Sequence, residues 1–257
     1  MRRLGQRLPA ALKHDGFTRF IVLSRSRTGS NLVVSLLASH PNIDAEGEIL
    51  KRLRGRNPGD VLDRAFGPQP FFIRAKGFKV FYYHPVDGRS EEVWERLESI
   101  PDLAVIHLRR WNVLRAVVSR RIAENRDEWL TRGKPIIATE AKAVTIGPEE
   151  LERAFRQTRV WESEGERRFA GHRVFPLWYE SLVADIPGTF AEITSFLGVR
   201  FVKPSTDLRR QNPEPLQDLL SNYDQLHESM RGTELEAFFT ESMEETPAEA
   251  GPATGTD

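Results

Sequence analysis

The sequence predicts an α/β fold of three layers (α/β/α), with helices on both faces of a central, mostly parallel sheet. The main observation is a repeated order along the chain. Apolar, β-branched segments of strand length alternate with longer segments of helical character. A second observation is that 257 residues with 39% hydrophobic content are enough to bury one large core. We find no internal repeat and no linker, so we expect residues 1–240 to form a single domain.

Four segments have the character of buried strands, because each is apolar, β-branched and bounded by polar residues. They cover residues 18–24, 78–83, 103–108 and 173–178. The first of them, TRFIVLS, leads through a short polar loop into the apolar segment NLVVSLLAS. This order predicts a strand, a tight loop and a helix.

Six longer segments favour helices. Ser90 and Asn112 are suited to cap helix N-termini, and Pro187 suits a first helical turn. Gly198 suits the left-handed residue that follows a helix. The predicted helices cover residues 31–39, 90–99, 112–125, 147–169, 187–197 and 221–240, with a shorter one around 59–66.

Two segments are expected to lack regular structure. Residues 127–146 show no clear period and predict a loop. Residues 241–257 hold five acidic and no basic side chains, so we expect a disordered acidic tail. The whole chain has 37 basic and 37 acidic residues, which leaves 37 against 32 before the tail. A mildly basic body suits an anionic ligand and gives no indication of a nucleic-acid partner.

Composition excludes several classes of site. The chain has no cysteine, which rules out disulfides, thiolate metal sites and a cysteine nucleophile. Its six histidines are never three to five residues apart, so the helical zinc-site spacing is missing and we expect no metal. No stretch approaches the roughly 20 apolar residues of a membrane span. We therefore expect a cytoplasmic protein without an integral membrane segment.

The loop between the first strand and the first helix has the composition of an anion site. A helix N-terminus offers unpaired N–H groups and partial positive charge. Gly29 allows a tight turn, Thr28 and Ser30 add hydroxyl donors, and Arg27 adds a cation. The alternative is a polar helix cap with solvated arginines. The Walker A pattern of ordinary ATPases and GTPases is absent.

A second strand runs into a helix at residues 105–119. Arg110 is expected at the strand end and Ser119 about two turns into the helix. A guanidinium and a hydroxyl so placed hold a phosphate from two sides. Arg109 directly precedes Arg110 in the sequence. The alternative is that both arginines are solvated and Ser119 is packed in the helix.

Residues 21–50, IVLSRSRTGSNLVVSLLASHPNIDAEGEIL, resemble the opening of sulfotransferases that use 3′-phosphoadenosine 5′-phosphosulfate (PAPS). They are most similar to the bacterial carbohydrate branch, which includes the nodulation-factor and trehalose sulfotransferases. The resemblance implies a P-loop-NTPase-like sulfotransferase fold. It also implies that the loop binds the 5′-phosphosulfate through Arg27, Thr28, Gly29, Ser30 and Asn31. Ser26 stands where the family usually has an apolar residue or proline, and the role of Arg25 stays open.

Three later segments resemble the same family. Residues 105–119 resemble its 3′-phosphate site, which implies that role for Arg110 and Ser119, although their spacing of nine differs from the more common eight. Residues 178–185 resemble a strand-to-helix element. Residues 208–216 resemble a late loop that closes over the nucleotide. That loop implies contacts from Arg209, Arg210 and Gln211 to the 3′-phosphate or the adenine.

The resemblance also suggests a general base. Gly47–Glu48 matches the position at which the carbohydrate branch has an acidic residue as its general base, and a dry pocket would raise the pKa of that carboxyl. Glu46 precedes the matched glycine and is the weaker candidate. His84 is the second candidate for the base, or else a packed strand-end residue. Lys79 either approaches the sulfuryl group or points to solvent.

We therefore expect sulfuryl transfer from PAPS to an acceptor hydroxyl, by in-line attack and without a metal. The resemblance suggests an acceptor on a sugar, glycolipid or other glycoconjugate. The alternatives are a P-loop-like small-molecule kinase and a non-catalytic nucleotide-binding protein. The sequence leaves the oligomeric state open.

Overall fold

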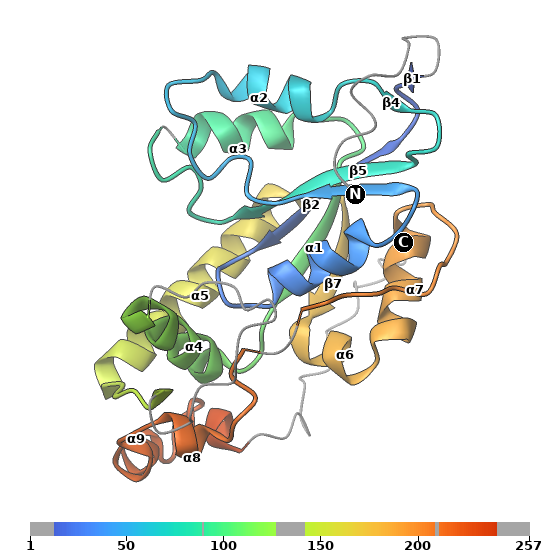
Figure 1. Cartoon of the computed structure of the whole chain (residues 1–257). Coiled ribbons are helices and arrows are strands. Elements are labelled where there is room, and N and C mark those ends of the chain that lie inside the picture. Colours follow the sequence, from blue (N-terminus) through green and yellow to red (C-terminus); the bar gives the residue numbers. More distant parts are fainter. Residues whose placement is uncertain (1–12, 89, 127–141, 209–210, 241–257) are drawn as a thin grey trace, which may run out of the picture.

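The computed structural model describes residues 13–88, 90–126, 142–208 and 211–240 (Figure 1). Five strands form one sheet in the order β3, β5, β2, β6, β7, and every neighbouring pair is parallel. The strands are β2 (Thr18–Ser24), β3 (Ile43–Glu46), β5 (Ala75–Phe81), β6 (Ala104–Arg109) and β7 (Arg173–Trp178). A small antiparallel pair joins β1 (Lys13–His14) to β4 (Gln69–Pro70). The predicted α/β fold with a central parallel sheet is confirmed.

Helices cover both faces of the sheet because side chains alternate along each strand. On β2, Ile21 and Leu23 pack in a cluster with α2 and α3, whereas Phe20 and Val22 pack with α1, α6 and α7. Figure 1 shows these two helical layers on opposite sides of the sheet. The helices are α1 (Ser30–Ala38), α2 (Pro58–Ala65), α3 (Ser90–Glu98), α6 (Tyr179–Ala184) and α7 (Ile186–Phe196).

A third apolar cluster lies beside this three-layer body. It joins α4 (Val113–Arg126) and α5 (Pro148–Arg168) to three short helices. These are α8 (Leu216–Leu219), α9 (Tyr223–Met230) and the 3-10 helix η4 (Glu236–Phe239). Asn112 caps α4 as predicted, because its side-chain oxygen accepts a hydrogen bond from the Arg115 N–H at 2.8 Å. Its amide nitrogen also donates to the carbonyl of Phe238 at 2.8 Å, which ties the start of α4 to η4.

Some predicted elements differ from the structure. The continuous helix predicted over residues 221–240 is wrong, because the chain turns after α9 through Gly232 at a φ of 74°. The strand predicted at 78–83 begins three residues earlier, at Ala75. The edge strand β3 was not predicted at all. Most of the loop at 127–146 and the whole tail at 241–257 lie outside the described residues.

Among the described residues, no helix combines the length and the apolar character that a membrane crossing requires.

Candidate active site

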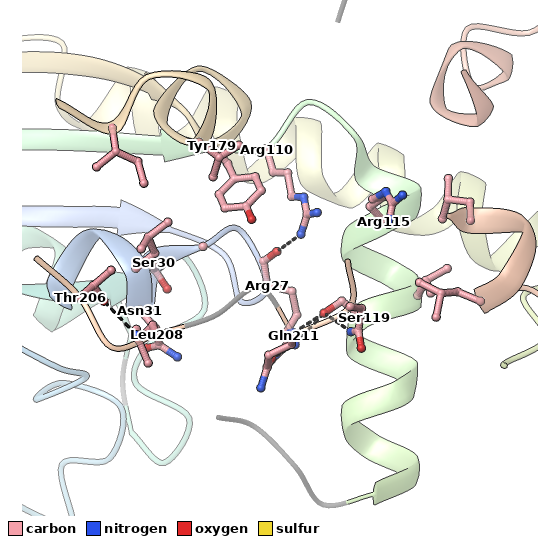
Figure 2. A pocket seen from close by; sticks show the side chains of 18 residues that line it. Arg27, Ser30, Asn31, Arg110, Arg115, Ser119, Tyr179, Thr206, Leu208 and Gln211 are labelled. Carbon is pink, nitrogen blue, oxygen red and sulfur yellow. Dashed lines mark hydrogen bonds between the residues drawn. The ribbon is translucent and has the colours of Figure 1, made fainter. Parts of the chain in front are cut away.

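The two motif loops meet because β2 and β6 are hydrogen-bonded parallel neighbours. Their carboxyl ends therefore lie at one edge of the sheet, where ligands bind in open α/β sheets. A cavity of about 450 Å³ opens there, which is within the usual size range of small-molecule sites. Residues of both loops line it, and Figure 2 shows several of their side chains directed toward one another. The predicted site residues among them are Arg27, Gly29, Ser30, Asn31, Arg110, Ser119 and Gln211.

Gly29 allows the first loop to pack closely against Tyr179. It precedes α1 in the left-handed region, at a φ of 88°, which favours glycine. A Cβ at this position would lie 2.3 Å from the ring of Tyr179, so a side chain has no room either. In the described part of the chain no side chain caps α1, which leaves its N-terminus suited to an anion. Thr28 does not line the cavity, because its hydroxyl donates to the Arg25 carbonyl at 2.8 Å.

Arg27 joins the two motifs directly. Its Nε and Nη2 atoms donate to the Ser119 hydroxyl oxygen at 3.0 and 2.6 Å, and Nη2 also donates to Gln211 (Figure 2). Arg110 donates to the backbone carbonyl of Arg27 at 2.9 Å. Its guanidinium also lies 4.7 Å from the ring centroid of Tyr179. The two strand ends thus face one cavity, and burial lowers the pKa of Arg27.

The neighbouring arginines point elsewhere. Arg109 pairs with Glu166 on α5 at 2.8 Å and stacks on Trp178, and it does not line the cavity. Arg25 is buried, donates to Thr158 on α5 and is also absent from the lining. Of the doubled arginine, Arg110 alone therefore reaches the cavity. Arg25 supports the packing of the loop against α5.

Several lining residues were missed by sequence reasoning. Arg115 on α4 lines the cavity and donates to the Glu214 carbonyl at 2.9 Å. It lies four residues before Ser119, so the helical spacing was the signal that could have found it. Asn212 donates to Ser119 at 3.3 Å. Arg209 and Arg210 lie outside the described residues, so their roles stay predictions.

The cavity combines cations with apolar walls. Arg27, Arg110 and Arg115 supply positive charge, and aliphatic side chains complete the lining. The aliphatic residues include Leu32, Val118, Ile186, Leu208 and Leu216. Such a lining suits a ligand that carries anionic groups on a flat or apolar body. In the described part of the chain, no group of three His, Asp or Glu side chains is arranged to hold a metal ion.

Glu48 lies outside this lining but is linked to it. Lys79 on β5 donates to Asn31 at the start of α1, and its Nζ is 3.0 Å from Glu48 Oε1. Lys51 approaches Glu48 Oε2 at 3.4 Å. Lys79 therefore points into the protein and not to solvent, with 7% of its side chain exposed. Glu46 instead pairs with Lys76, which also binds Asp44 at 2.5 Å.

The expectation of a raised pKa at Glu48 needs correction. Burial does raise the pKa of this carboxyl, but the positive charge and hydrogen bond of Lys79 lower it by more, with help from Lys51. The net pKa lies below its ordinary value. The carboxyl is half-buried and paired, so it is held in its ionised form. An ionised carboxylate is the form that accepts a proton.

His84 lies beside Glu48, with Nε2 at 3.7 Å from Oε2. The ring is fully buried, and burial lowers the pKa of His84 to about 4. Its Nδ1 accepts a hydrogen bond from the Phe81 N–H at 3.2 Å. The free lone pair that a base requires is thus already engaged, which argues against His84 as the proton acceptor.

No protein-family model matches the chain. Curated relatives do match it over most of its length. Nodulation protein H of Rhizobium tropici is 26% identical over 242 residues, which is 86% of this chain and 92% of that protein. Nodulation protein H of Rhizobium meliloti (strain 1021) is 25% identical over 222 residues, covering 80% and 89%.

Solved structures resemble the chain more distantly. A sulfotransferase from Alicyclobacillus acidocaldarius has a TM-score of 0.48 at 17% identity and covers 87% of this chain and 92% of its own. A mouse sulfotransferase solved with PAP has a TM-score of 0.47 at 13% identity, covering 88% and 91%. TM-scores below 0.5 carry no argument about function. The likeness to a family therefore rests on the motifs and on the sequence relatives. In four motifs that follow the family's order, and in relatives that span most of its length, this chain is similar to the sulfotransferase family.

Proposed function

We propose that the enzyme transfers a sulfuryl group from PAPS to a hydroxyl of a carbohydrate or glycoconjugate, with Glu48 as the general base. The observation that carries this proposal is the meeting of Arg27 and Arg110, from two different strand ends, in one cavity. A doubly phosphorylated adenosine has anionic groups at two ends of one apolar body. Two separate cationic positions beside aliphatic walls are the lining that such a ligand needs.

The donor has two proposed contact regions. Arg27, Ser30 and Asn31, with the N-terminus of α1, hold the 5′-phosphosulfate. Arg110, Ser119 and the loop around Gln211 hold the 3′-phosphate. Thr28 supports the first region through the loop backbone and not from the lining. The contact between Arg27 and Ser119 supports one ligand across both regions.

The chemistry follows from positioning and charge. The acceptor oxygen bonds to sulfur while the bond from sulfur to the donor phosphate oxygen breaks, and the hydroxyl proton moves to Glu48. Arg27 and the N–H groups of α1 stabilise the negative charge that develops on the leaving bisphosphate. Lys79 links Asn31 to Glu48, which supports a role for this cation beside the sulfuryl group.

Three finer features belong to the same proposal. The match of Gly47–Glu48 to the carbohydrate branch supports a sugar acceptor. A chain without cysteines has no need of an oxidising compartment for disulfides, which supports a cytoplasmic reaction. We also propose that residues 1–240 act as one domain and that the acidic segment 241–257 takes no part in the chemistry.

The test is sulfuryl transfer from labelled PAPS to a panel of sugar and glycolipid hydroxyls, with Glu48→Gln as the variant. We expect Glu48→Gln to bind 3′-phosphoadenosine 5′-phosphate as the unchanged protein does and to lose most turnover, about 100-fold or more. Glu46→Gln is the matched control, because it removes a carboxylate two residues away that pairs with Lys76. Unchanged turnover in Glu48→Gln would remove Glu48 from the mechanism.

A further inference from the structure

Two buried polar atoms face each other beside the proposed base. Glu48 Oε2 and His84 Nε2 are both buried, and neither has a hydrogen-bond partner among the described residues. They are 3.7 Å apart, slightly longer than a hydrogen bond. Buried polar atoms are normally satisfied, so a facing pair of this kind indicates an interaction that forms in another state of the site.

The surroundings of His84 fix the position of its proton. Nδ1 accepts from the Phe81 N–H, so the neutral ring must carry its hydrogen on Nε2, the atom that faces Glu48. The rings of Phe81 and Tyr83 pack against His84, with centroids 4.9 and 5.6 Å away. The imidazole is therefore locked in orientation and presents one N–H donor to the carboxylate.

The two oxygens of Glu48 have different neighbours. Oε1 is 3.0 Å from Lys79, which also holds Asn31 at the cavity. Oε2 faces Lys51 at 3.4 Å and the His84 N–H. Lys51 is 55% exposed in its side chain, whereas His84 is fully buried. His84 is thus the buried neighbour of Oε2, and Lys51 is the solvent-exposed one.

From this geometry we infer that His84 is a positioning residue for sulfuryl transfer, a fixed N–H donor that orients the Glu48 carboxylate toward the acceptor hydroxyl. The inference rests on the proposed function. When the Oε2 to Nε2 distance shortens to a hydrogen bond, one lone pair of Oε2 is fixed and the other is directed at the incoming hydroxyl. No proton leaves His84 in this step, since its hydrogen stays on Nε2.

The test compares two amide replacements of His84. Glutamine places an N–H near the position of imidazole Nε2, whereas asparagine places its amide near Nδ1 and does not reach Glu48. We expect His84→Gln to keep most turnover. We expect His84→Asn to lower kcat about ten- to a hundredfold with little change in KM. The acid limb of kcat/KM should also move to higher pH in His84→Asn, because the ionised form of Glu48 loses a donor while Lys79 and Lys51 remain.

His40→Gln is the matched control. His40 is another buried histidine, and its Nδ1 also accepts a backbone N–H, that of Asn42 at 3.1 Å. Its Nε2 contacts the Arg200 carbonyl at 2.9 Å and not Glu48. Thermal melting of each variant ensures that rates are compared at equal folded fraction.

Three outcomes would overturn the inference. The first is a kcat in His84→Asn equal to that in His40→Gln, and the second is an acid limb that stays in place. The third is a His84→Gln variant as inactive as His84→Asn, the result expected if His84 were the base. The proposed function fails separately, if Glu48→Gln retains its turnover. Loss of turnover in Glu48→Gln together with full activity in His84→Asn would reject only the positioning role.

Discussion

At the scale of single residues, opposing effects decide the ionisation of Glu48. Burial acts to raise the pKa of its carboxyl, and the positive charge of Lys79 acts to lower it. Burial lowers the pKa of Lys79, and the contact with Glu48 partly offsets this decrease. The carboxyl of Glu48 is thus ionised at neutral pH. As the proposed base, the Glu48 carboxylate can accept a proton without first having to lose one.

This pairing predicts the effect of Lys79→Met. Removing the cation leaves burial as the main influence, so the pKa of Glu48 should rise. The acid limb of the kcat/KM profile should then move to higher pH. The profile is measured from pH 4 to 9 beside Lys203→Met, which removes an exposed lysine outside the cavity lining. An acid limb that stays in place or moves to lower pH would contradict the account.

The sequence alone does not show whether Arg109 or Arg110 reaches the ligand. The sequence places Arg109 and Arg110 at a strand end, and successive side chains there point to opposite faces. Which of the two reaches the ligand depends on the position of α5, whose Glu166 pairs with Arg109. The helix α5 lies some 40 residues further along the chain, so no local pattern contains this information. The pKa of Glu48 was mispredicted for the same reason, because Lys79 comes from another strand.

At the scale of elements, α4 connects the cap at Asn112 to the predicted phosphate contact at Ser119. Asn112 is buried, and its side chain makes two hydrogen bonds, one to the first turn of α4 and one to η4. These bonds fix both the start of the helix and its attachment to the third cluster. The positions of Arg115 and Ser119 in the cavity depend on that start.

Asn112→Ala should therefore lower the free energy of unfolding by about 2 kcal/mol, as expected for a lost cap that also leaves the buried Phe238 carbonyl unpaired. Asn57→Ala is the control, because Asn57 caps α2 with a single bond to the Gly59 N–H, for which we expect a loss of about 0.5 to 1 kcal/mol. Urea unfolding measures both. An equal loss of unfolding free energy in the two variants would show that the bond from Asn112 to Phe238 does not contribute to stability.

Local pattern also explains which elements were predictable. The first strand, its loop and α1 follow from an apolar run, a polar break and a proline after His40. The strand β3 has the sequence IDAE and lies at the sheet edge with one fully buried residue, so it carries no apolar signal. The region at 221–240 looks helical throughout. The helix ends before Gly232, which adopts a positive φ. Glycine allows this conformation, but the sequence does not require it.

At the scale of the whole molecule, two buried histidines affect stability. Burial lowers the pKa of His84 to about 4 and that of His107 to about 3, and His107 contacts the Tyr82 hydroxyl at 2.7 Å. Both are neutral in the folded protein. In the unfolded chain each takes up a proton near the ordinary value of 6.5. Stability is therefore full above about pH 6.5 and is lost as the pH falls from there toward 4.

His84→Gln tests this dependence, because glutamine does not titrate. For His84 alone the loss between pH 6.5 and 4 amounts to at most about 3 kcal/mol, and the variant should show a correspondingly flatter decline. The measurement is the urea midpoint at several pH values in this range. Equal slopes for the variant and the unchanged protein would mean that burial of His84 does not affect its ionisation.

The central claim is that Arg27 and Arg110 bind one doubly phosphorylated adenosine. Isothermal titration with 3′-phosphoadenosine 5′-phosphate tests it most directly, using Arg110→Met and, as its matched control, Arg109→Met. We predict that the unchanged protein binds, that Arg110→Met binds about tenfold more weakly or worse, and that Arg109→Met binds nearly as well as the unchanged protein. Absence of binding by the unchanged protein, or an equal loss in the two variants, would contradict the account.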